Sequence, residues 1–331
     1  MNEHVTTSYI TTPGIGLNNA AVRFTYLAFL IITLLSSLIG DSIILAASIA
    51  PNGIRLNRFI VTIMQHIAVS DLISCFSFVL PTITIFISNR WVIPEIVSYI
   101  RLYLDVTVFA ANSLLICLMS SSKLLLLRKP SNVLRFTTKQ AHVACAIIWF
   151  CTNVFSVVYA VIKIDELRHS SFESAAIDYL AYFRIGITQI LPVLIMIITT
   201  ILILVHLAKA RKIAKRTNGK TNLRGVATVV ITVVVYCVSI IPTLATNIKD
   251  FIFKGDHSTI QLGWFATSFT GLNIMSNIYV YCLTIPSLRE YIKVRVLRNL
   301  SKFGIINDAR NETRPDTGND TRNETRNETR N

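Results

Sequence analysis

The chain has 331 residues, and its composition is unusual for a soluble protein of that length. Asp, Glu, Lys and Arg make up only 15% of it, against about 25% in typical soluble globular proteins. The 32 Lys and Arg residues outnumber the 18 Asp and Glu residues, which gives a formal net charge of +14. Such an excess occurs in nucleic-acid-binding proteins and in the cytoplasmic loops of membrane proteins, so the positions of the cations decide between the two.

Seven long apolar stretches follow one another along the chain, each with the roughly 20 residues that a helix needs to cross a bilayer. They are Phe24–Ala50, Phe59–Ile87, Leu102–Leu127, His142–Ile162, Ile185–Leu207, Val226–Asn247 and Leu262–Leu283. Ile31–Ile39 and Val226–Val235, which lie within two of these stretches, show little of the polar face that a surface helix of a soluble bundle requires. The sequence therefore predicts an all-α integral membrane protein with a seven-transmembrane helix bundle, over residues 24–283, and a soluble helical bundle is the weaker alternative.

The cations are distributed unevenly between the segments that join these stretches. If residues 1–23 form an extracellular N-terminus, the inner segments hold 19 Lys and Arg residues and the outer segments hold 8. The positive-inside rule then predicts a multi-pass plasma-membrane protein whose C-terminus is cytoplasmic. The first stretch is expected to stay as a signal anchor, because no cleavable signal peptide is evident. The charge excess is thus attributed to orientation in the lipid membrane, and no nucleic-acid partner is predicted.

The sequence changes character twice after the seventh stretch. Tyr291–Arg298 combines an apolar face with a basic face, which is typical of a helix lying on a membrane surface. We therefore expect residues 284–303 to form a short amphipathic helix. Residues 304–331 carry an NETR-like repeat with glycosylation acceptors, which favours an outside location, but the cation count outweighs that signal.

The segment 304–331 has almost no apolar residue to bury, so we expect a disordered cytoplasmic tail. Threonines recur in it every four residues beside Asp or Glu. Phosphorylation would make this segment strongly negative and suited to an arrestin-like partner, and the alternative is an inert low-complexity tail. These threonines are Thr313, Thr317, Thr321, Thr325 and Thr329.

Polar side chains inside the spans are the first candidates for function, because they are costly to place in lipid. They include the carboxylates Asp41, Asp71 and Asp105 and the amides Asn112, Asn273 and Asn277. No HxxxH or HExxH spacing occurs, which argues against the zinc site of a membrane hydrolase, so no enzyme is expected. All six cysteines lie in the spans, so no disulfide framework is indicated.

Several motifs occur in an order that resembles the rhodopsin-like G-protein-coupled receptors. Ile67-Ala68-Val69-Ser70-Asp71-Leu72 is similar to the LAxxD motif of that family, and Asn277-Ile278-Tyr279-Val280-Tyr281 is similar to NPxxY with Ile278 in place of proline. Further matches are single residues at the family's spacing, namely Trp149, Pro192, Pro242 and Pro286. The resemblance covers residues 24–300 and implies a seven-helix receptor with an eighth helix that starts near Pro286.

The chain departs from the family at its switch residues. Ser122 and Lys123 stand where the family has the Asp and Arg of its DRY motif, and Lys lacks the planar five-donor group of Arg. Ile240 stands where the family has a tryptophan, two residues before the helix proline. The resemblance implies a G-protein coupling and switch region made of Ser122, Lys123, Pro242, Asn277 and Tyr281, and these departures leave open whether coupling is retained.

The resemblance also implies a sodium site in the middle of the bundle. By the family pattern its ligands would be Asp71, Asn112, Asn273 and Asn277. Carboxylate and carbonyl oxygens suit a hard cation of this kind. The alternative is a sodium-free hydrogen-bonded network that satisfies buried polar groups, with one proton held by the neighbouring carboxylates Asp41 and Asp71.

Asp105 is the predicted ligand-binding residue. It lies eighteen residues before Lys123, where the amine receptors of the family place the aspartate that pairs with a ligand ammonium. The alternatives are an internal Lys or Arg partner, or hydration. Ser268 and Gly271 replace the aromatic residues of the usual amine cage, and Gly271 also stands where opsins carry the retinal lysine, so no retinal or other cofactor is expected.

The sequence therefore predicts a receptor that binds an extracellular ligand inside the helix bundle and signals to heterotrimeric G proteins. The ligand is a small molecule or a peptide, and an amine is one candidate. A non-signalling receptor-like protein is an alternative that the Ser122-Lys123 departure supports. A cation- or proton-coupled transporter is a further alternative that the intramembrane carboxylates support, although no paired broken helices or internal repeats are evident.

Overall fold

Within the described residues the regular structure of this chain is entirely helical, as the sequence predicts. The structure is a computed structural model, and it describes residues 20–50, 54, 56–88, 93–128, 137–168, 180, 182–216, 224–252 and 259–302. The segment predicted to be extracellular, up to residue 19, and the predicted tail with its five threonines lie outside these ranges. Statements below that something is absent refer only to the described ranges.

The helices follow the predicted stretches in order. They are α1 (Ala20–Ile49), α2 (Arg58–Ser74), η1 (Cys75–Val79), α3 (Leu80–Ser88), α4 (Glu95–Arg128), α5 (Thr138–Arg168), η2 (Gly186–Ile190), α7 (Leu191–Arg216), α8 (Arg224–Ile252), α9 (Thr259–Thr284) and α10 (Pro286–Lys302). Six segments within the described residues are long and apolar enough to cross a membrane, and they coincide with the first six predicted stretches. The helix α9 coincides with the seventh stretch.

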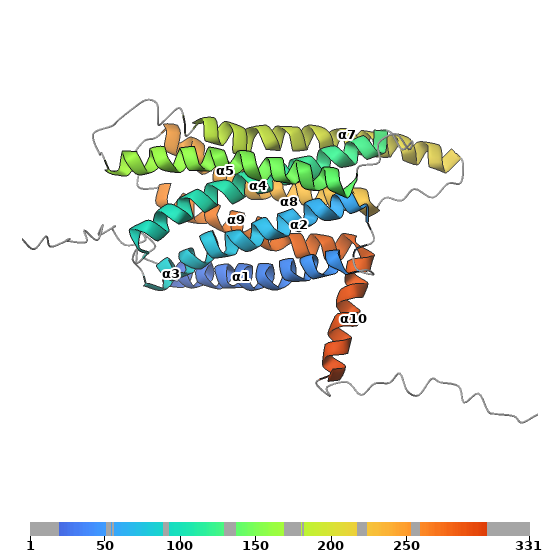
Figure 1. Ribbon diagram of the computed structural model, residues 1–331, viewed down its shortest axis with the longest axis horizontal. Coiled ribbons are helices and arrows are strands. Elements are labelled where there is room, and N and C mark those ends of the chain that lie inside the picture. Colours follow the sequence, from blue (N-terminus) through green and yellow to red (C-terminus); the bar gives the residue numbers. More distant parts are fainter. Residues whose placement is uncertain are drawn as a thin grey trace, which may run out of the picture. The chain divides into compact units, whose positions relative to one another are not determined.

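The described residues from Ala20 to Tyr291 belong to one compact unit, in which the long helices run roughly along a common axis and α1 packs against α2, as α8 does against α9 (Figure 1). The central element is α4, which packs against α2, α5, α7 and α8. The helix α1 packs against α2 and α9, and α8 packs against α9. This arrangement places the polar residues of α2, α4 and α9 toward a common interior.

The bundle buries small polar side chains and exposes large apolar ones. Phe150 of α5 is 70% exposed and Ile198 of α7 is 56% exposed, whereas Ser70 and Ser113 are fully buried. Many buried hydroxyls donate to a carbonyl of their own helix, as Ser113 does to Phe109 at 2.8 Å. An apolar exterior with internally satisfied polar groups is the pattern that a hydrocarbon environment requires.

Two turns of π-helix precede the prolines of the second and fifth spans. The N–H of Leu80 bonds to the carbonyl of Cys75, five residues back, and the N–H of Leu191 bonds in the same way to Gly186. The prolines Pro81 and Pro192 come next in each sequence, and proline cannot donate a helix hydrogen bond. The wider turns therefore lie where the regular α-helical ladder is interrupted.

Candidate functional site

A cavity of about 320 Å³ lies inside the bundle, in the half where α4 begins. We call this half the Asp105 end and the opposite half the Lys123 end. Residues of α2, η1, α4, η2, α8 and α9, with Arg184 just before η2, form the cavity wall. Its polar members are Ser74, Asp105, Asn112, Arg184, Gln189, Thr243, Thr246, Asn247, Thr270 and Asn273. The predicted ligand-binding residue Asp105 thus lines the cavity.

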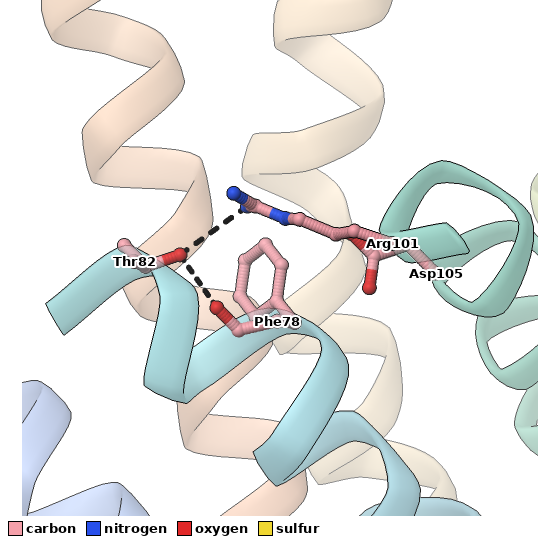
Figure 2. Close-up of polar contacts among 4 residues, drawn as sticks. All are labelled: Phe78, Thr82, Arg101 and Asp105. Carbon is pink, nitrogen blue, oxygen red and sulfur yellow. Dashed lines mark hydrogen bonds and ion pairs between the residues drawn. The ribbon is translucent and has the colours of Figure 1, made fainter. Parts of the chain in front are cut away.

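Asp105 has an internal cationic partner. The Nε of Arg101 lies 3.3 Å from the Oδ2 of Asp105, one helical turn away on α4, and the two side chains are 16% and 28% exposed. Arg101 reaches across to the second span, where its Nη2 donates to the Oγ1 of Thr82 at 3.4 Å and its guanidinium lies 5.8 Å from the ring centre of Phe78 (Figure 2). The structure therefore supports the alternative of an internal partner that the sequence leaves open.

Arg101 is a residue whose role the sequence interpretation missed. The signal for it is the spacing of four residues between Arg101 and Asp105, which brings opposite charges together on one face of a helix. The hydroxyl of Thr82 also donates to the carbonyl oxygen of Phe78 at 2.6 Å, so the group that receives Arg101 is itself held in place. The four residues form one connected cluster at the Asp105 end.

Asp71 is the centre of a second polar group, which lies deeper in the bundle. Its side chain is fully buried. The Nδ2 of Asn112 donates to its Oδ1 at 2.9 Å, and the Nδ2 of Asn277 donates to its Oδ2 at 2.5 Å. The structure thus brings together three of the four residues predicted to hold sodium. The fourth, Asn273, lies on the wall of the cavity, which Asn112 also lines.

The donor set around Asp71 fits a hard cation. Asp41 is buried beside it, accepts a hydrogen bond from Ser37 and interacts electrostatically with Asp71. The Oδ1 of Asn112 is buried and has no hydrogen-bond partner among the described residues. Either a cation or a shared proton relieves the repulsion between two neighbouring carboxylates, and an unused amide oxygen is a suitable ligand for a sodium ion.

The described residues contain no group of three or more His, Cys, Asp or Glu side chains suited to hold a metal ion. The rings of His66 and His142 do meet, with centroids 5.7 Å apart, but they are two residues.

The comparison with protein families decides the class of the molecule. A family model described as 7 transmembrane receptor (rhodopsin family) matches residues 44–281. The chain belongs to the rhodopsin family of seven-transmembrane receptors. The resemblance that the sequence motifs indicate is confirmed. The matched range contains the cavity-lining residues, the predicted switch residues, and Asp71 with its partners Asn112 and Asn277, which we call the Asp71 group. A comparison with the curated proteins found no match.

No hydrogen bond or ion pair among the described residues joins Ser122 and Lys123, the residues predicted to stand at the DRY position. Ser122 is buried, and its hydroxyl donates to the carbonyl oxygen of Met119 at 2.8 Å. Lys123 is half-buried, and no hydrogen bond or ion pair joins it to a described side chain. A serine cannot neutralise the neighbouring cation as an aspartate does. The receptor therefore lacks, among the described residues, a charged restraint at the Lys123 end.

Of the other predicted switch residues, Asn277 and Tyr281 are buried in the receptor core and Pro242 is partly buried. Pro242 lies inside α8, and its carbonyl oxygen accepts a hydrogen bond from Thr246 at 2.8 Å. The side chain of Tyr281 is fully buried, and its hydroxyl has no partner among the described residues. Asn277 donates a hydrogen bond to Asp71, as described above, and Tyr281 interacts electrostatically with Asp71 and Asp41.

Two further contacts join helices of this receptor at positions that the sequence interpretation missed. The hydroxyls of Ser113 on α4 and Tyr236 on α8 share a buried hydrogen bond. Ser120 of α4 and Thr199 of α7 lie 3.1 Å apart through their hydroxyl oxygens. Hydroxyl residues are common in membrane helices, so composition alone does not distinguish these inter-helix contacts from hydroxyls that bond only to their own helix.

Proposed function

We propose that the chain is a plasma-membrane receptor that binds an extracellular ligand in the Asp105 cavity and signals to heterotrimeric G proteins. The observation that carries this proposal is a cavity of about 320 Å³ inside a bundle of the rhodopsin family. Its size falls within the range of small-molecule sites. In this proposal the N-terminus and the Asp105 end are extracellular, and the Lys123 end faces the cytoplasm, as the cation distribution requires.

The helices at the C-terminal side complete the architecture in this proposal. The 26 residues of α9 form the seventh span. The 17 residues of α10 form the amphipathic eighth helix, which carries basic side chains and, in its first ten residues, the half-exposed Val294. A helix of this composition suits the boundary between lipid and cytoplasm. The tail threonines beyond it are proposed as phosphorylation sites that recruit an arrestin-like partner.

Pro242 is the proposed hinge between ligand and G protein. Thr243 and Thr246, which follow it, line the cavity. Tyr236, which precedes it, holds α8 to α4 through Ser113. Because Pro242 donates no helix hydrogen bond, a bend of α8 at this position disrupts fewer bonds than a bend elsewhere. A ligand that favours one packing of Thr243 and Thr246 therefore biases the position of α8 on the other side of the hinge.

The Asp71 group is the proposed sodium site. Asp71, the free Oδ1 of Asn112 and Asn277 would hold the ion, with Asn273 on the adjoining wall. A sodium ion would relieve the repulsion between the two neighbouring carboxylates Asp71 and Asp41. The amide hydrogen bonds from Asn112 and Asn277 to Asp71 also hold α2, α4 and α9 together.

A receptor-like protein that does not signal is the second candidate function. The observation that favours it is the arrangement of Ser122 and Lys123, because Lys123 offers a G protein a compact ammonium in place of a planar guanidinium. This candidate keeps the cavity and the fold and differs only at the Lys123 end.

A coupling assay in cells separates the two candidates. Wild type and the Lys123→Arg, Lys123→Ala and Lys139→Arg variants are expressed at equal surface levels with a panel of G-protein reporters, and ligand-independent signal is compared with that of untransfected cells. We expect a signal from wild type with at least one G protein, a severalfold higher signal from Lys123→Arg, and a loss in Lys123→Ala. Lys139 is exposed near the start of α5, so Lys139→Arg serves as the matched control.

Silence from wild type and from Lys123→Arg across the whole panel, at confirmed surface expression, would contradict G-protein signalling. It would support the receptor-like protein that does not signal.

A further inference from the structure

Arg184 is the second charged residue on the cavity wall, beside Asp105. It lies in the short helical stretch of residues 182–185 that leads into η2. Its side chain lines the same cavity as Asp105 and carries the opposite charge. Its guanidinium lies 5.1 Å from the ring centre of Tyr159. Its Nε is buried and has no hydrogen-bond partner among the described residues. A buried cationic donor without a partner is costly unless something else supplies the acceptor.

The charges of the residues that line the cavity show that the positive charge of Arg184 has no neutralising partner among the described residues. Arg184 and Asp105 are the two charged residues among the described residues that line the cavity. Asp105 is already paired with Arg101, whose guanidinium is further held by Thr82 and Phe78 (Figure 2). That pair neutralises the charge of Asp105 within the protein, although the Oδ1 of Asp105 and the Nη1 of Arg101 are buried and have no hydrogen-bond partner among the described residues. The described wall therefore carries one positive charge that no described carboxylate neutralises.

We propose that the cavity binds an organic carboxylate whose head group pairs with Arg184. This inference rests on the proposed function only in taking the cavity as the ligand site. It names a ligand class opposite in charge to the amine that the position of Asp105 suggests from sequence.

The chemistry of the wall fits a carboxylate head on an apolar body. A guanidinium presents its N–H groups in a planar fork that matches a carboxylate, and the Tyr159 ring interacts with the cation without using those N–H groups. Gln189 and Asn247, which share a 3.1 Å hydrogen bond, place neutral amides on the same wall. The apolar members are Phe78, Leu102, Val106, Val108, Phe109, Ala266 and Ile274.

A single arginine favours a carboxylate over a phosphate. Phosphate groups carry about two negative charges at neutral pH and are usually held by clusters of cations. The described wall offers one unneutralised guanidinium and the negative end of an ion pair. A ligand with one negative charge neutralises the Arg184 guanidinium, whereas a dianion would leave one uncompensated negative charge in a largely apolar cavity.

Binding of three matched probes tests the inference. The probes are 3-phenylpropanoate, 3-phenylpropylamine and 3-phenylpropanol, which share one apolar body and differ in the head group. Thermal unfolding of the purified full-length receptor in lipid nanodiscs is followed as each probe is titrated, without any G protein. We expect the carboxylate to bind wild type at least tenfold more tightly than the amine or the alcohol.

Variants assign the preference to a residue. Arg184→Gln is expected to lower carboxylate affinity at least tenfold and to leave alcohol affinity unchanged, and Arg184→Lys to give an intermediate loss. Arg23→Gln is the matched control, because Arg23 donates to the carbonyl oxygen of Phe86 at 3.0 Å and does not line the cavity. Asp105→Asn is expected to retain carboxylate binding.

Three results would overturn the inference. They are equal affinity of wild type for the three head groups, a carboxylate preference that persists in Arg184→Gln, and preferred amine binding that Asp105→Asn abolishes. If Arg184→Gln does not fold, Arg184→Lys decides, because an unchanged carboxylate affinity there contradicts the planar pairing. A receptor that binds the carboxylate and is silent in every coupling assay would overturn the signalling proposal and leave this inference standing.

Discussion

Gly40 of α1 lies so close to Ile278 of α9 that a Cβ atom on residue 40 would be 2.6 Å from the Cβ of Ile278. Ordinary contacts between such carbon atoms begin near 3.4 Å. The Cβ of Ile278 is bonded directly to the backbone, so no rotamer change moves it away. Gly40 therefore allows α1 and α9 to approach each other at the position where the family motif has proline instead of Ile278.

Gly40→Ala is expected to destabilise the receptor by about 1–3 kcal/mol, because an added methyl group in a packed interface forces the backbone to shift. The measurement is thermal unfolding of the purified receptor. Gly186→Ala is the matched control, since a Cβ there meets no atom within 4 Å. Ile278→Ala in the Gly40→Ala background should recover part of the loss, and a Gly40→Ala receptor as stable as wild type would contradict the close approach.

Arg101 and Asp105 should be energetically coupled. Arg101→Gln leaves a mostly buried carboxylate without its cation, and Asp105→Asn leaves a mostly buried guanidinium without its anion, so each single change is expected to lower stability. The double variant should lose less than the sum of the two, with a coupling of about 0.5–3 kcal/mol. A double-mutant cycle of unfolding midpoints measures this, and strict additivity would mean that the ion pair contributes nothing.

Sodium should stabilise the wild-type receptor. Thermal unfolding is compared in sodium chloride and in potassium chloride at the same ionic strength, for wild type, Asp71→Asn and Asp105→Asn. A ligand that binds only the folded state raises its stability with concentration. We expect the sodium-specific increase in wild type and Asp105→Asn and its loss in Asp71→Asn. The same midpoint in both salts for wild type would leave the Asp71 group as a network without an ion.

The hydrogen bond between Ser113 and Tyr236 should hold α8 against α4. Tyr236→Phe removes it, and Ser113 keeps its bond to the carbonyl oxygen of Phe109, so the expected loss is about 0.5–1.5 kcal/mol. Tyr281→Phe is the control, because the buried Tyr281 hydroxyl has no partner among the described residues and its removal should not destabilise. Unfolding midpoints of the two variants are compared, and equal values would argue against the contact.

The sequence predicts the helical spans well because lipid imposes a strong and simple requirement, a long apolar segment with internally bonded backbone. The grouping of Asp71, Asn112 and Asn277 is also predicted, since the family motifs fix those positions on three helices. The partner of Asp105 and the role of Arg184 are not. Whether a charged side chain is neutralised depends on which neighbours reach it, and Thr82, Phe78 and Tyr159 come from other helices.

The approach of Gly40 to Ile278 likewise depends on how two helices far apart in the chain pack. A glycine in an apolar stretch is consistent with a close contact and with an empty groove, and Gly40 and Gly186 show both outcomes in one receptor. The position of a glycine in the sequence does not tell whether it lies at a close helix contact or beside open space.

The π-turn η1 divides the second span into two segments with different angular phase. One extra residue in a turn rotates every later side chain by roughly 100° relative to a continuous α-helix. Asp71 precedes the turn and faces the deep polar group, whereas Thr82 follows it and meets Arg101. Residues 71 and 82 on one unbroken helix would be tied to a fixed relative orientation. The inserted residue changes that orientation, so Thr82 meets Arg101 at the Asp105 end while Asp71 meets Asn112 and Asn277 deeper in the bundle.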